Sequence, residues 1–416
     1  MYRLTAVPFF ALLLCSCNAT DAALGAGGSE KIPDGGAIKA TALTRVDLGT
    51  MGGRSSYAAD INGFNTVVGW SETTGGATRA FRWSDAQGMV DLGTLPGDQV
   101  SRAVAVLDGG QILGVSGDGS RWTPVVWSAA GSISALPISL IPGFTVALPT
   151  DFNARGDVVG SDAGGFQHGW IWSPSSGKYD LSANIDGGYE GSASGVSASG
   201  LVLLTSMSNA CVRTVQCWRT YLWDKSAGYR SLGTPGNAAE VNVTGLALSE
   251  TGTVAGWFAS GAASGTTAYR WDASKGFTLL DSYSTGSFRY GYATAVNSNG
   301  TVVGADLDPA SGSIVASTWL ASGKIVKLSP EDPNPSVAVA VNNPGTIAGW
   351  AAVSNGVNHA VIWKPSSQAS ANVLRAPTTV TAVRVSTPSE PCLADSRSIT
   401  SRQALFACVI KADSKR

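Results

Sequence analysis

One ten-residue pattern recurs along this chain at long intervals. Residues 61–70 are INGFNTVVGW, residues 296–305 are VNSNGTVVGA, and residues 341–350 are VNNPGTIAGW. A tryptophan recurs with steps of 44, 45, 51, 48, 48 and 44 residues, at Trp83, Trp127, Trp172, Trp223, Trp271, Trp319 and Trp363. Self-similarity at such a period is typical of repeat architectures in which each unit is one supersecondary motif. The chain is therefore expected to fold as seven copies of one unit.

Each unit contains four short strand-like segments. In the first unit these are SYAADIN, TVVGW, RAFRW and MVDLG. The many glycines (51 of 416 residues) and the low charged fraction (14%) also suit short strands joined by tight turns. We therefore predict an all-β fold, a β-propeller with seven four-stranded blades. Eight DLG-like segments occur, from residues 46–48 to residues 372–374, so the first either closes the ring or joins the C-terminal segments in a partial eighth blade. We favour seven blades.

The residue types of each segment predict its place in a blade. The first segment is rich in small residues such as Ala58, Ala103 and Ala293, so we place it innermost, where strands are crowded. The DLG segment is then outermost, and the recurrent tryptophan fills the space between blades. Asn or Ser follows the first segment, with Gly or Asn three residues later. These pairs predict a tight turn with a left-handed residue, so the asparagines are turn formers and not ligands.

The segments DLGT, AADIN, TVVGW and RAFRW resemble the bacterial extracellular repeats called HAF repeats, over roughly residues 44–375. Their His-Ala-Phe signature is kept in part in RAFRW, residues 79–83, and in NHAVIW, residues 358–363. The resemblance implies an exported β-propeller but supplies no reaction and no active-site residues. WD40 repeats are a poorer match, because no Gly-His…Trp-Asp pair recurs at the right places.

The N-terminus predicts export. Arg3 precedes an apolar run over residues 6–14, which is too short to span a bilayer. The LCSC that follows, residues 14–17, resembles a bacterial lipobox, which implies cleavage before Cys17 and lipidation of its thiol. Asn18 then favours the outer membrane or cell surface, by analogy with enteric bacteria. The alternative is an ordinary secretory signal, with a secreted or periplasmic product.

These observations divide the chain into four parts. Residues 1–16 are a signal peptide, residues 17–42 a lipidated cysteine and a Gly- and Ala-rich flexible tether, residues 43–375 the propeller, and residues 376–416 a C-terminal extension. Export favours disulfides between the four remaining cysteines, Cys211, Cys217, Cys392 and Cys408. Sequence neighbours suggest the pairs Cys211–Cys217 and Cys392–Cys408, although three pairings are possible. The second pair would staple a hairpin in the C-terminal extension.

Charge and motifs exclude several function classes. The chain has 28 basic and 29 acidic residues, so it has no electrostatic footprint for nucleic acid. Its two histidines, His168 and His359, each lie four residues before a repeat tryptophan, in a slot that holds Thr or Val in other units. We therefore expect blade positions there and neither a catalytic triad nor a metal site. No cofactor is expected, and DLDP at residues 306–309 is a weak calcium candidate that we predict to be a solvated turn.

The connections of the predicted blades fall into two sets. Those after the first and third strands are short and repetitive, whereas those after the second strand and between blades are long and varied. Binding residues tend to lie on variable loops held by a rigid scaffold, so we place the candidate site on the long-loop face. The candidates there are Arg54, Tyr57, Arg102, Tyr189, Glu190, Tyr283, Phe288, Arg289, Tyr290, Tyr292, Glu331 and Asp332. Exposed aromatic side chains beside arginine are suited to stacking on sugars or anchoring a protein.

Three functions are compatible with this pattern. The first is an exported, membrane-anchored and monomeric propeller without enzymatic activity, which binds a glycan or an envelope or extracellular protein. The second is a polysaccharide-acting enzyme, a hydrolase or lyase, which needs loop carboxylates that converge near the axis; the candidates are Asp186, Glu190, Glu240, Glu331 and Asp332. The third is a structural envelope protein. The fold class cannot choose among them, because one propeller scaffold supports many functions.

Overall fold

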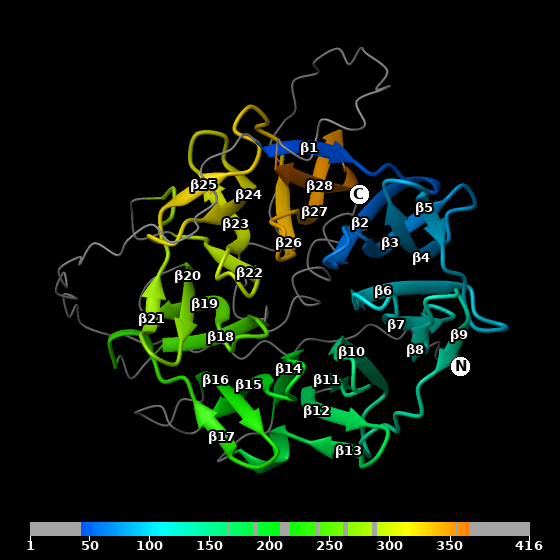
Figure 1. The fold of residues 1–416 in the computed structure, drawn as a ribbon, viewed down its shortest axis with the longest axis horizontal. Coiled ribbons are helices and arrows are strands. Elements are labelled where there is room, and N and C mark those ends of the chain that lie inside the picture. Colours follow the sequence, from blue (N-terminus) through cyan, green and yellow to red (C-terminus); the bar gives the residue numbers. More distant parts are fainter. Residues whose placement is uncertain are drawn as a thin grey trace, which may run out of the picture.

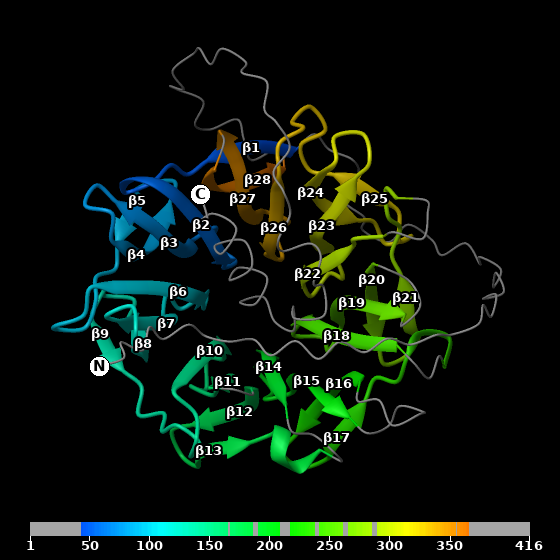
Figure 2. The ribbon, with the colours of Figure 1, turned by 180° about the vertical axis from the view of Figure 1, so that it is seen from behind.

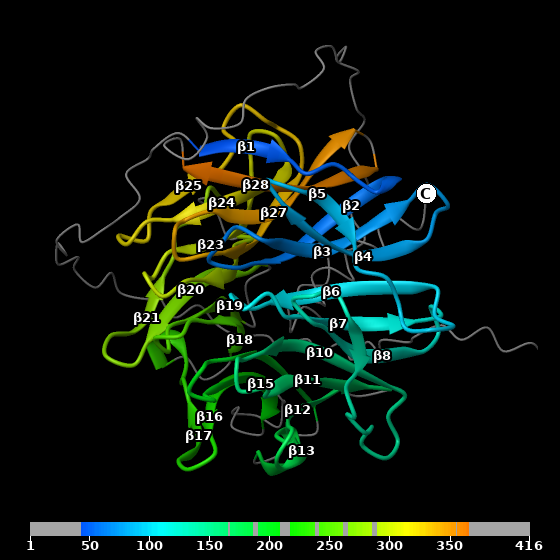
Figure 3. The same cartoon turned by 45° about the vertical axis from the view of Figure 1, so that its right-hand side comes forward.

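The protein forms a seven-bladed β-propeller. The computed structural model describes residues 43–365, except residues 165–166, 186–189, 209–216, 238–240, 261–264, 285–288 and 355. In this part of the chain, seven four-stranded antiparallel sheets surround one axis (Figure 1), and the view from behind shows the same ring (Figure 2). The oblique view separates the blades and shows β1 beside β28 (Figure 3). The predicted fold class and blade number are confirmed.

Six blades are meanders whose strands follow one another in chain order from the axis outward. Their strands are β2 (Gly52–Ile61), β3 (Val67–Thr73), β4 (Thr78–Ser84) and β5 (Gly88–Asp91) in blade 1; β6 (Val100–Val106), β7 (Ile112–Gly117), β8 (Trp122–Trp127) and β9 (Ile133–Ala135) in blade 2; β10 (Val146–Phe152), β11 (Val158–Ala163), β12 (Gln167–Ser173) and β13 (Gly177–Asp180) in blade 3; β14 (Gly191–Val196), β15 (Val202–Ser208), β16 (Cys217–Asp224) and β17 (Gly228–Ser231) in blade 4; β18 (Val241–Leu248), β19 (Val254–Ser260), β20 (Thr267–Asp272) and β21 (Gly276–Leu279) in blade 5; and β22 (Tyr292–Val296), β23 (Val302–Asp308), β24 (Ser313–Trp319) and β25 (Ile325–Lys327) in blade 6. Two short 3-10 helices, η1 (Ser182–Asn184) and η2 (Pro235–Asn237), lie in connections between blades.

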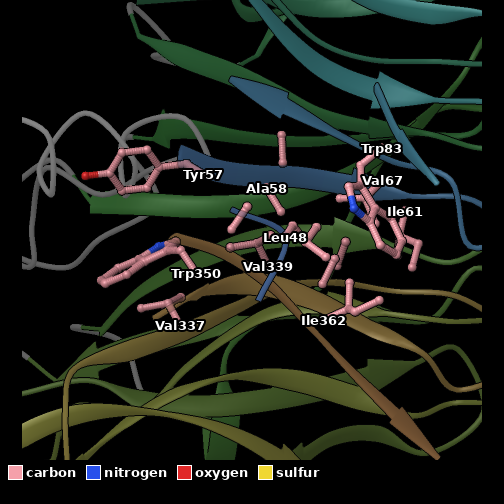
Figure 4. Close-up of a cluster of buried hydrophobic side chains, with 14 of the residues drawn as sticks. Leu48, Tyr57, Ala58, Ile61, Val67, Trp83, Val337, Val339, Trp350 and Ile362 are labelled. Carbon is pink, nitrogen blue, oxygen red and sulfur yellow. The ribbon is translucent and has the colours of Figure 1, made fainter. Parts of the chain in front are cut away.

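Blade 7 is built from both ends of the propeller sequence. It contains β26 (Ser336–Val341), β27 (Ile347–Ser354), β28 (Val357–Pro365) and, as its outermost strand, β1 (Leu43–Asp47). The first of the eight DLG-like segments therefore closes the ring. Leu48, which follows β1, is buried in a core shared by blades 7 and 1, where Trp83 and Ile362 also lie (Figure 4).

The packing of each blade agrees with the residue types of its strands. The alanine-rich strand is innermost in every sheet and the DLG strand outermost, as predicted. All seven recurrent tryptophans are buried, and Trp127 packs against residues of both blade 1 and blade 2. Each inner strand also carries a β-bulge at the same place, at Ala59, Val104, Thr150, Ser194, Leu246, Thr294 and Val339. The hydroxyls of Thr150 and Thr294 donate from these bulges to carbonyls of the next blade, at 2.6 and 2.7 Å.

The recurrent asparagines do more than form turns. The residue three positions later has a positive φ in every unit, from +62° at Asn65 to +91° at Gly345, as the sequence predicts. The asparagine Oδ1 accepts backbone N–H bonds inside its own turn, for example from Thr346 at 2.9 Å on Asn342. Its Nδ2 donates to the corresponding carbonyl of the next blade, from Asn297 to Asn342 at 2.9 Å and from Asn342 to Asn62 at 2.8 Å. The last bond crosses the ring closure.

Replacing Asn342 with serine is expected to lower the free energy of unfolding by about 1–3 kcal/mol. Serine occupies this slot at Ser197, where its Oγ still accepts the turn N–H of Leu201 at 3.1 Å. The turn is therefore kept, whereas the carbonyl of Asn62 loses a buried donor. Urea unfolding of Asn342→Ser beside Asn334→Ser, which changes an exposed asparagine, measures this difference. Equal midpoints for the two variants would contradict the role of Nδ2 in joining the blades.

Candidate functional site

Five side chains from blades 7, 1 and 2 are linked by ring and cation–π contacts on the long-loop face. We call Tyr57, Trp70, Arg102, Trp122 and Trp350 the mouth cluster. Tyr57 and Arg102 occupy the same position of two inner strands, one residue before the alanine that pairs with a second-strand glycine. Trp70 is the register partner of Tyr57, and Trp350 has the same place in blade 7. Because register partners project from the same face of a sheet, each tyrosine or arginine lies beside a second-strand side chain.

The rings of the mouth cluster are in direct contact. The ring centres of Tyr57 and Trp70 are 5.7 Å apart and stacked, and those of Tyr57 and Trp350 are 6.1 Å apart with an edge-to-face geometry. Figure 4 shows Tyr57 and Trp350 facing each other across the boundary between blades 1 and 7. Cζ of Arg102 lies 5.5 Å from the ring centre of Trp70 and 5.4 Å from that of Trp122. The guanidinium is thus held by two cation–π contacts, one from each of two blades.

Arg102 has no acidic counterpart. Among the described residues it forms no ion pair, and its Nε is buried without a hydrogen-bond partner. Burial lowers the pKa of its guanidinium below the usual value. The lysines that lie over aromatic rings elsewhere differ, because Lys178, Lys327 and Lys364 each form an ion pair with an aspartate. The mouth cluster therefore combines apolar ring faces with an uncompensated positive charge.

A second aromatic group lies between blades 5 and 6. Tyr292 holds the inner-strand position of Tyr57 and packs on Trp257 of the preceding blade, with ring centres 6.0 Å apart. Both side chains are buried, and Tyr290 packs against them. We expected exposed aromatic side chains on this face, and that expectation is wrong for Tyr57 and Tyr292, which are 6% and 3% exposed. They are buried because inner-strand side chains at this level pack on the neighbouring blade.

Asp306 is a buried acid and not part of a solvated turn, which corrects the sequence prediction. It lies in β23 and is 0% exposed. Burial raises its pKa to about 7, against the hydrogen bond from Ser282 Oγ at 3.0 Å and the nearby charge of Arg289. Its Oδ2 has no hydrogen-bond partner within the described part of the chain.

Asp162, the equivalent residue of blade 3, has an ion-pair partner that Asp306 lacks among the described residues. It occupies the same second-strand position in blade 3 and is also fully buried, but Lys178 Nζ lies 2.5 Å from its Oδ2. Lys178 is the register partner of Trp172, whereas the equivalent Trp319 of blade 6 is paired with Ile325. Asp306 therefore has no basic side chain in that place, and its raised pKa makes it titrate near neutral pH.

The propeller axis contains a small polar cavity. Its volume is about 150 Å³, and residues of all seven inner strands line it, Asp60 and Asp151 among them. Asp60 Oδ2 accepts the backbone N–H of Val106, and Asp151 Oδ2 accepts that of Val196, both at 2.9 Å. Each carboxylate thus joins its blade to the next one. In the part of the chain that the structure describes, no group of three His, Cys, Asp or Glu side chains is placed to hold a metal ion.

Three of the five loop carboxylates that the enzyme hypothesis requires lie among the described residues: Glu190, Glu331 and Asp332. Asp332 forms an ion pair with Arg45 of β1, the outermost strand of blade 7, so it is held away from the axis. Glu331 beside it is exposed, and Glu190 lies in blade 4, where burial raises its pKa while His168 lowers it. The ion pair with Arg45 therefore does not support convergence of Asp332 with the other carboxylates. Four of the residues named above lie outside the described residues: Asp186, Tyr189, Glu240 and Phe288.

The remaining candidates lie apart from the mouth cluster. Arg54 is exposed in β2, and its backbone N–H donates to Glu72 Oε2 at 3.0 Å. Tyr283 accepts a hydrogen bond from Ser317 Oγ at 3.3 Å and lies under Lys327. Arg289 is exposed, and its carbonyl accepts the N–H of Thr266 at 2.6 Å. Of the twelve candidates, only Tyr57 and Arg102 belong to the mouth cluster.

The two histidines form cross-strand pairs with the outermost strands. His168 Nδ1 lies 2.9 Å from Asp180, and His359 Nδ1 lies 2.9 Å from Asp47. Arg79 holds the same slot in blade 1 and lies 3.9 Å from Asp91. In blades 1, 3 and 7 this slot therefore ties the third strand to the fourth. Cys217 is disulfide-bonded, and because every other cysteine lies outside the described residues, the pairing with Cys211 stays a prediction. The same holds for lipidation of Cys17 and for the pair Cys392–Cys408.

The candidates predicted from the sequence did not include the three tryptophans of the mouth cluster, although a recurrent sequence pattern marks two of them. Trp70 and Trp350 each end a second-strand segment of the form Val/Ile-Val/Ala-Gly-Trp, and this recurrence marks a fixed structural position. Trp122 starts a third strand, and no pattern links it to Arg102. Their meeting depends on which faces of neighbouring blades oppose each other.

Comparisons with solved structures find chains of similar fold at low sequence identity. No family model matches the chain, and no curated protein matches it. Virginiamycin B lyase from Staphylococcus aureus is 10% identical, with a TM-score of 0.46, over 77% of this chain and 98% of the lyase. TolB from Acinetobacter baumannii is 15% identical, with a TM-score of 0.42, over 66% and 63% of the two chains. The acylaminoacyl peptidase from Pyrococcus horikoshii is 9% identical, with a TM-score of 0.49, over 76% and 52%. At these values the comparisons carry no inference about ligand or reaction.

No helix in the described ranges is long and apolar enough to cross a membrane.

Proposed function

We propose that this chain is an exported binding propeller that takes a saccharide at the mouth cluster. The observation that carries the proposal is the uncompensated Arg102 guanidinium between Trp70 and Trp122, beside Tyr57 and Trp350. Trp122 is the partly exposed ring of the cluster, and an aromatic face suits the C–H face of a pyranose ring, while the nearby guanidinium gives orientation. The ring scaffold holds these side chains on strands of three blades, so the site needs little ordering when a ligand binds.

The cellular setting comes from the sequence. The lipobox-like LCSC, the tether over residues 17–42 and the resemblance to HAF repeats together favour an anchored propeller outside the cytoplasm. At such a surface, a saccharide site would connect the cell to its envelope or to an external polysaccharide. A protein partner, an enzymatic activity on polysaccharide and a purely structural role remain alternative outcomes of the same experiment.

Replacing Trp122 with alanine is expected to weaken saccharide binding about tenfold or more, because truncation of a central aromatic contact typically costs well over 1 kcal/mol. Trp122 is the partly exposed tryptophan of the cluster, so its loss opens no large core cavity. The measurement is binding of the full chain to a saccharide array, followed by titration with the saccharides that bind.

Trp218→Ala is the matched control for this variant. Trp218 has the position of Trp122 in blade 4, is also partly exposed, and lies far from Arg102 along the ring. It should bind within about twofold of the wild type if the site is at blades 1 and 2. Equal losses in both variants would contradict the assigned location. Failure of the wild type to bind any saccharide, with a protein captured from the envelope instead, would replace the proposed function by an assembly role.

A further inference from the structure

We propose that the mouth cluster recognises the carboxylate of an acidic saccharide through Arg102. This inference rests on the proposed function, because it names the class of saccharide that the same site takes. A structural role for the guanidinium alone does not account for its surroundings. The other buried cations that stack on rings carry their own anion, whereas Arg102 has none among the described residues. A buried donor without a partner is costly and is commonly completed by a ligand.

The position of Arg102 suits an incoming anion. It occupies the inner strand β6 directly after the connection from blade 1, at the end of the strand that opens onto the long-loop face. Trp70 and Trp122 contact the guanidinium and leave it without a carboxylate from the chain, within the described residues. Because the rings also desolvate the guanidinium, a charge-assisted bond formed there is stronger than one formed in water.

The chemistry around Arg102 favours one ligand class. The planar fork of guanidinium binds carboxylates with two parallel hydrogen bonds. The adjacent ring faces favour an apolar, nearly flat surface in the same ligand. A hexuronate or sialate offers both, since one pyranose ring carries the carboxylate and an axial C–H face. An acidic peptide offers the carboxylate without the ring, so we treat it as the competing outcome.

Arg230 supplies a matched control within the same chain. Its Cζ lies 5.2 Å from the ring centre of Trp271, so its chemistry resembles that of Arg102. It is exposed on β17, the outermost strand of blade 4, and also lacks an ion pair within the described part. The two arginines share a cation–π contact and the lack of an ion pair, and they differ in their place on the propeller and in their burial. If the preference for acidic over neutral saccharides arises at the mouth cluster, Arg102→Gln should reduce it and Arg230→Gln should leave it unchanged.

The test is calorimetric titration of the full chain with matched acidic and neutral saccharides: trigalacturonate with its methyl ester, and 3′-sialyllactose with lactose. We expect at least one acidic member to bind roughly tenfold tighter than its neutral counterpart in the wild type. In Arg102→Gln the ratio of the two affinities should fall to about one, whereas in Arg230→Gln it should stay at the wild-type value. Raising the salt from about 20 mM to about 300 mM should lower the ratio in the wild type, because the contact is ionic.

Each result of the titrations either supports or overturns the role of Arg102 in binding a carboxylate. Equal affinity of the wild type for acidic and neutral partners would overturn the role of the carboxylate while leaving the saccharide site in place. A preference that persists in folded Arg102→Gln would overturn the role of this residue. If that variant does not fold, Arg102→Lys, which keeps the charge, together with the salt dependence of the wild type, decides instead. Binding of an acidic peptide without any saccharide would overturn both this inference and the proposed function.

Discussion

Deletion of residues 43–49 is expected to lower the free energy of unfolding by roughly 5 kcal/mol or more. These residues contain β1, which pairs with β28 along five register positions and completes blade 7. Leu48 fills the core between blades 7 and 1, and its N–H donates to Ala360 at 2.9 Å. Loss of β1 also removes the partners of His359 and Asp332 and leaves β28 as a free edge. A change of this size is a large part of the total stability of a domain.

The measurement is thermal or urea unfolding followed by circular dichroism. A chain that lacks only residues 1–42 keeps β1 and serves as the control. We expect the control to unfold as the full chain does and the deletion of residues 43–49 to broaden or abolish the cooperative transition. A midpoint unchanged by that deletion would show that β1 does not close the ring in solution.

The second large effect is a loss of stability between about pH 4 and pH 7, caused by Asp306. Burial raises the pKa of Asp306 to about 7 in the folded protein, whereas an aspartate in the unfolded chain titrates near 3.8. Between these values the folded state binds more protons than the unfolded state. Stability is therefore highest below the unfolded pKa, falls as the pH rises, and levels off above the folded pKa. The shift of about three units corresponds to about 4 kcal/mol.

Asp306→Asn should remove this slope, because a neutral amide does not ionise. Asp308 in the same strand is the control: burial raises its pKa, but hydrogen bonds from Lys327 and Ser311 outweigh burial and hold its pKa below the usual value. Asp308 therefore contributes stability above its unfolded pKa that is lost as the pH falls, which is the opposite sign. Urea unfolding of both variants and the wild type from about pH 2 to about pH 8 measures the two slopes, because the Asp308 slope lies below pH 3.8. Identical pH profiles for the wild type and Asp306→Asn would contradict the assignment.

Much of the architecture follows from the sequence because the repeat makes local patterns visible seven times. The tryptophan period predicted the blade number, the alanines predicted the inner strand, and the Asn–Gly spacing predicted turns with a left-handed residue. Closure by β1 was one of two alternatives, because only the pairing of distant segments distinguishes them. The bond from Asn342 Nδ2 to the next blade could not be foreseen, since nothing local specifies which carbonyl a neighbouring blade presents.

The candidate site was less predictable, because the local sequence does not specify which side chains of neighbouring blades contact each other. Arg102 and Tyr57 were expected on the long-loop face, but their contacts with Trp70, Trp122 and Trp350 depend on the stacking of blades. Asp306 was misassigned because Asp-Leu-Asp-Pro is typical of a turn, whereas the strand register places this aspartate opposite Val315 and inside the blade packing. Local composition predicts the elements, and the inter-blade contacts decide which side chains become a site.

The central claim is that ligand binding takes place at the mouth cluster. The most direct test is hydrogen–deuterium exchange of the full chain with and without the tightest-binding saccharide of the titration panel. We predict slower exchange around Tyr57 in β2, Arg102 in β6 and Trp122 in β8, and no change at β17. Protection confined to other blades, or no protection at saturating ligand, would contradict the claim.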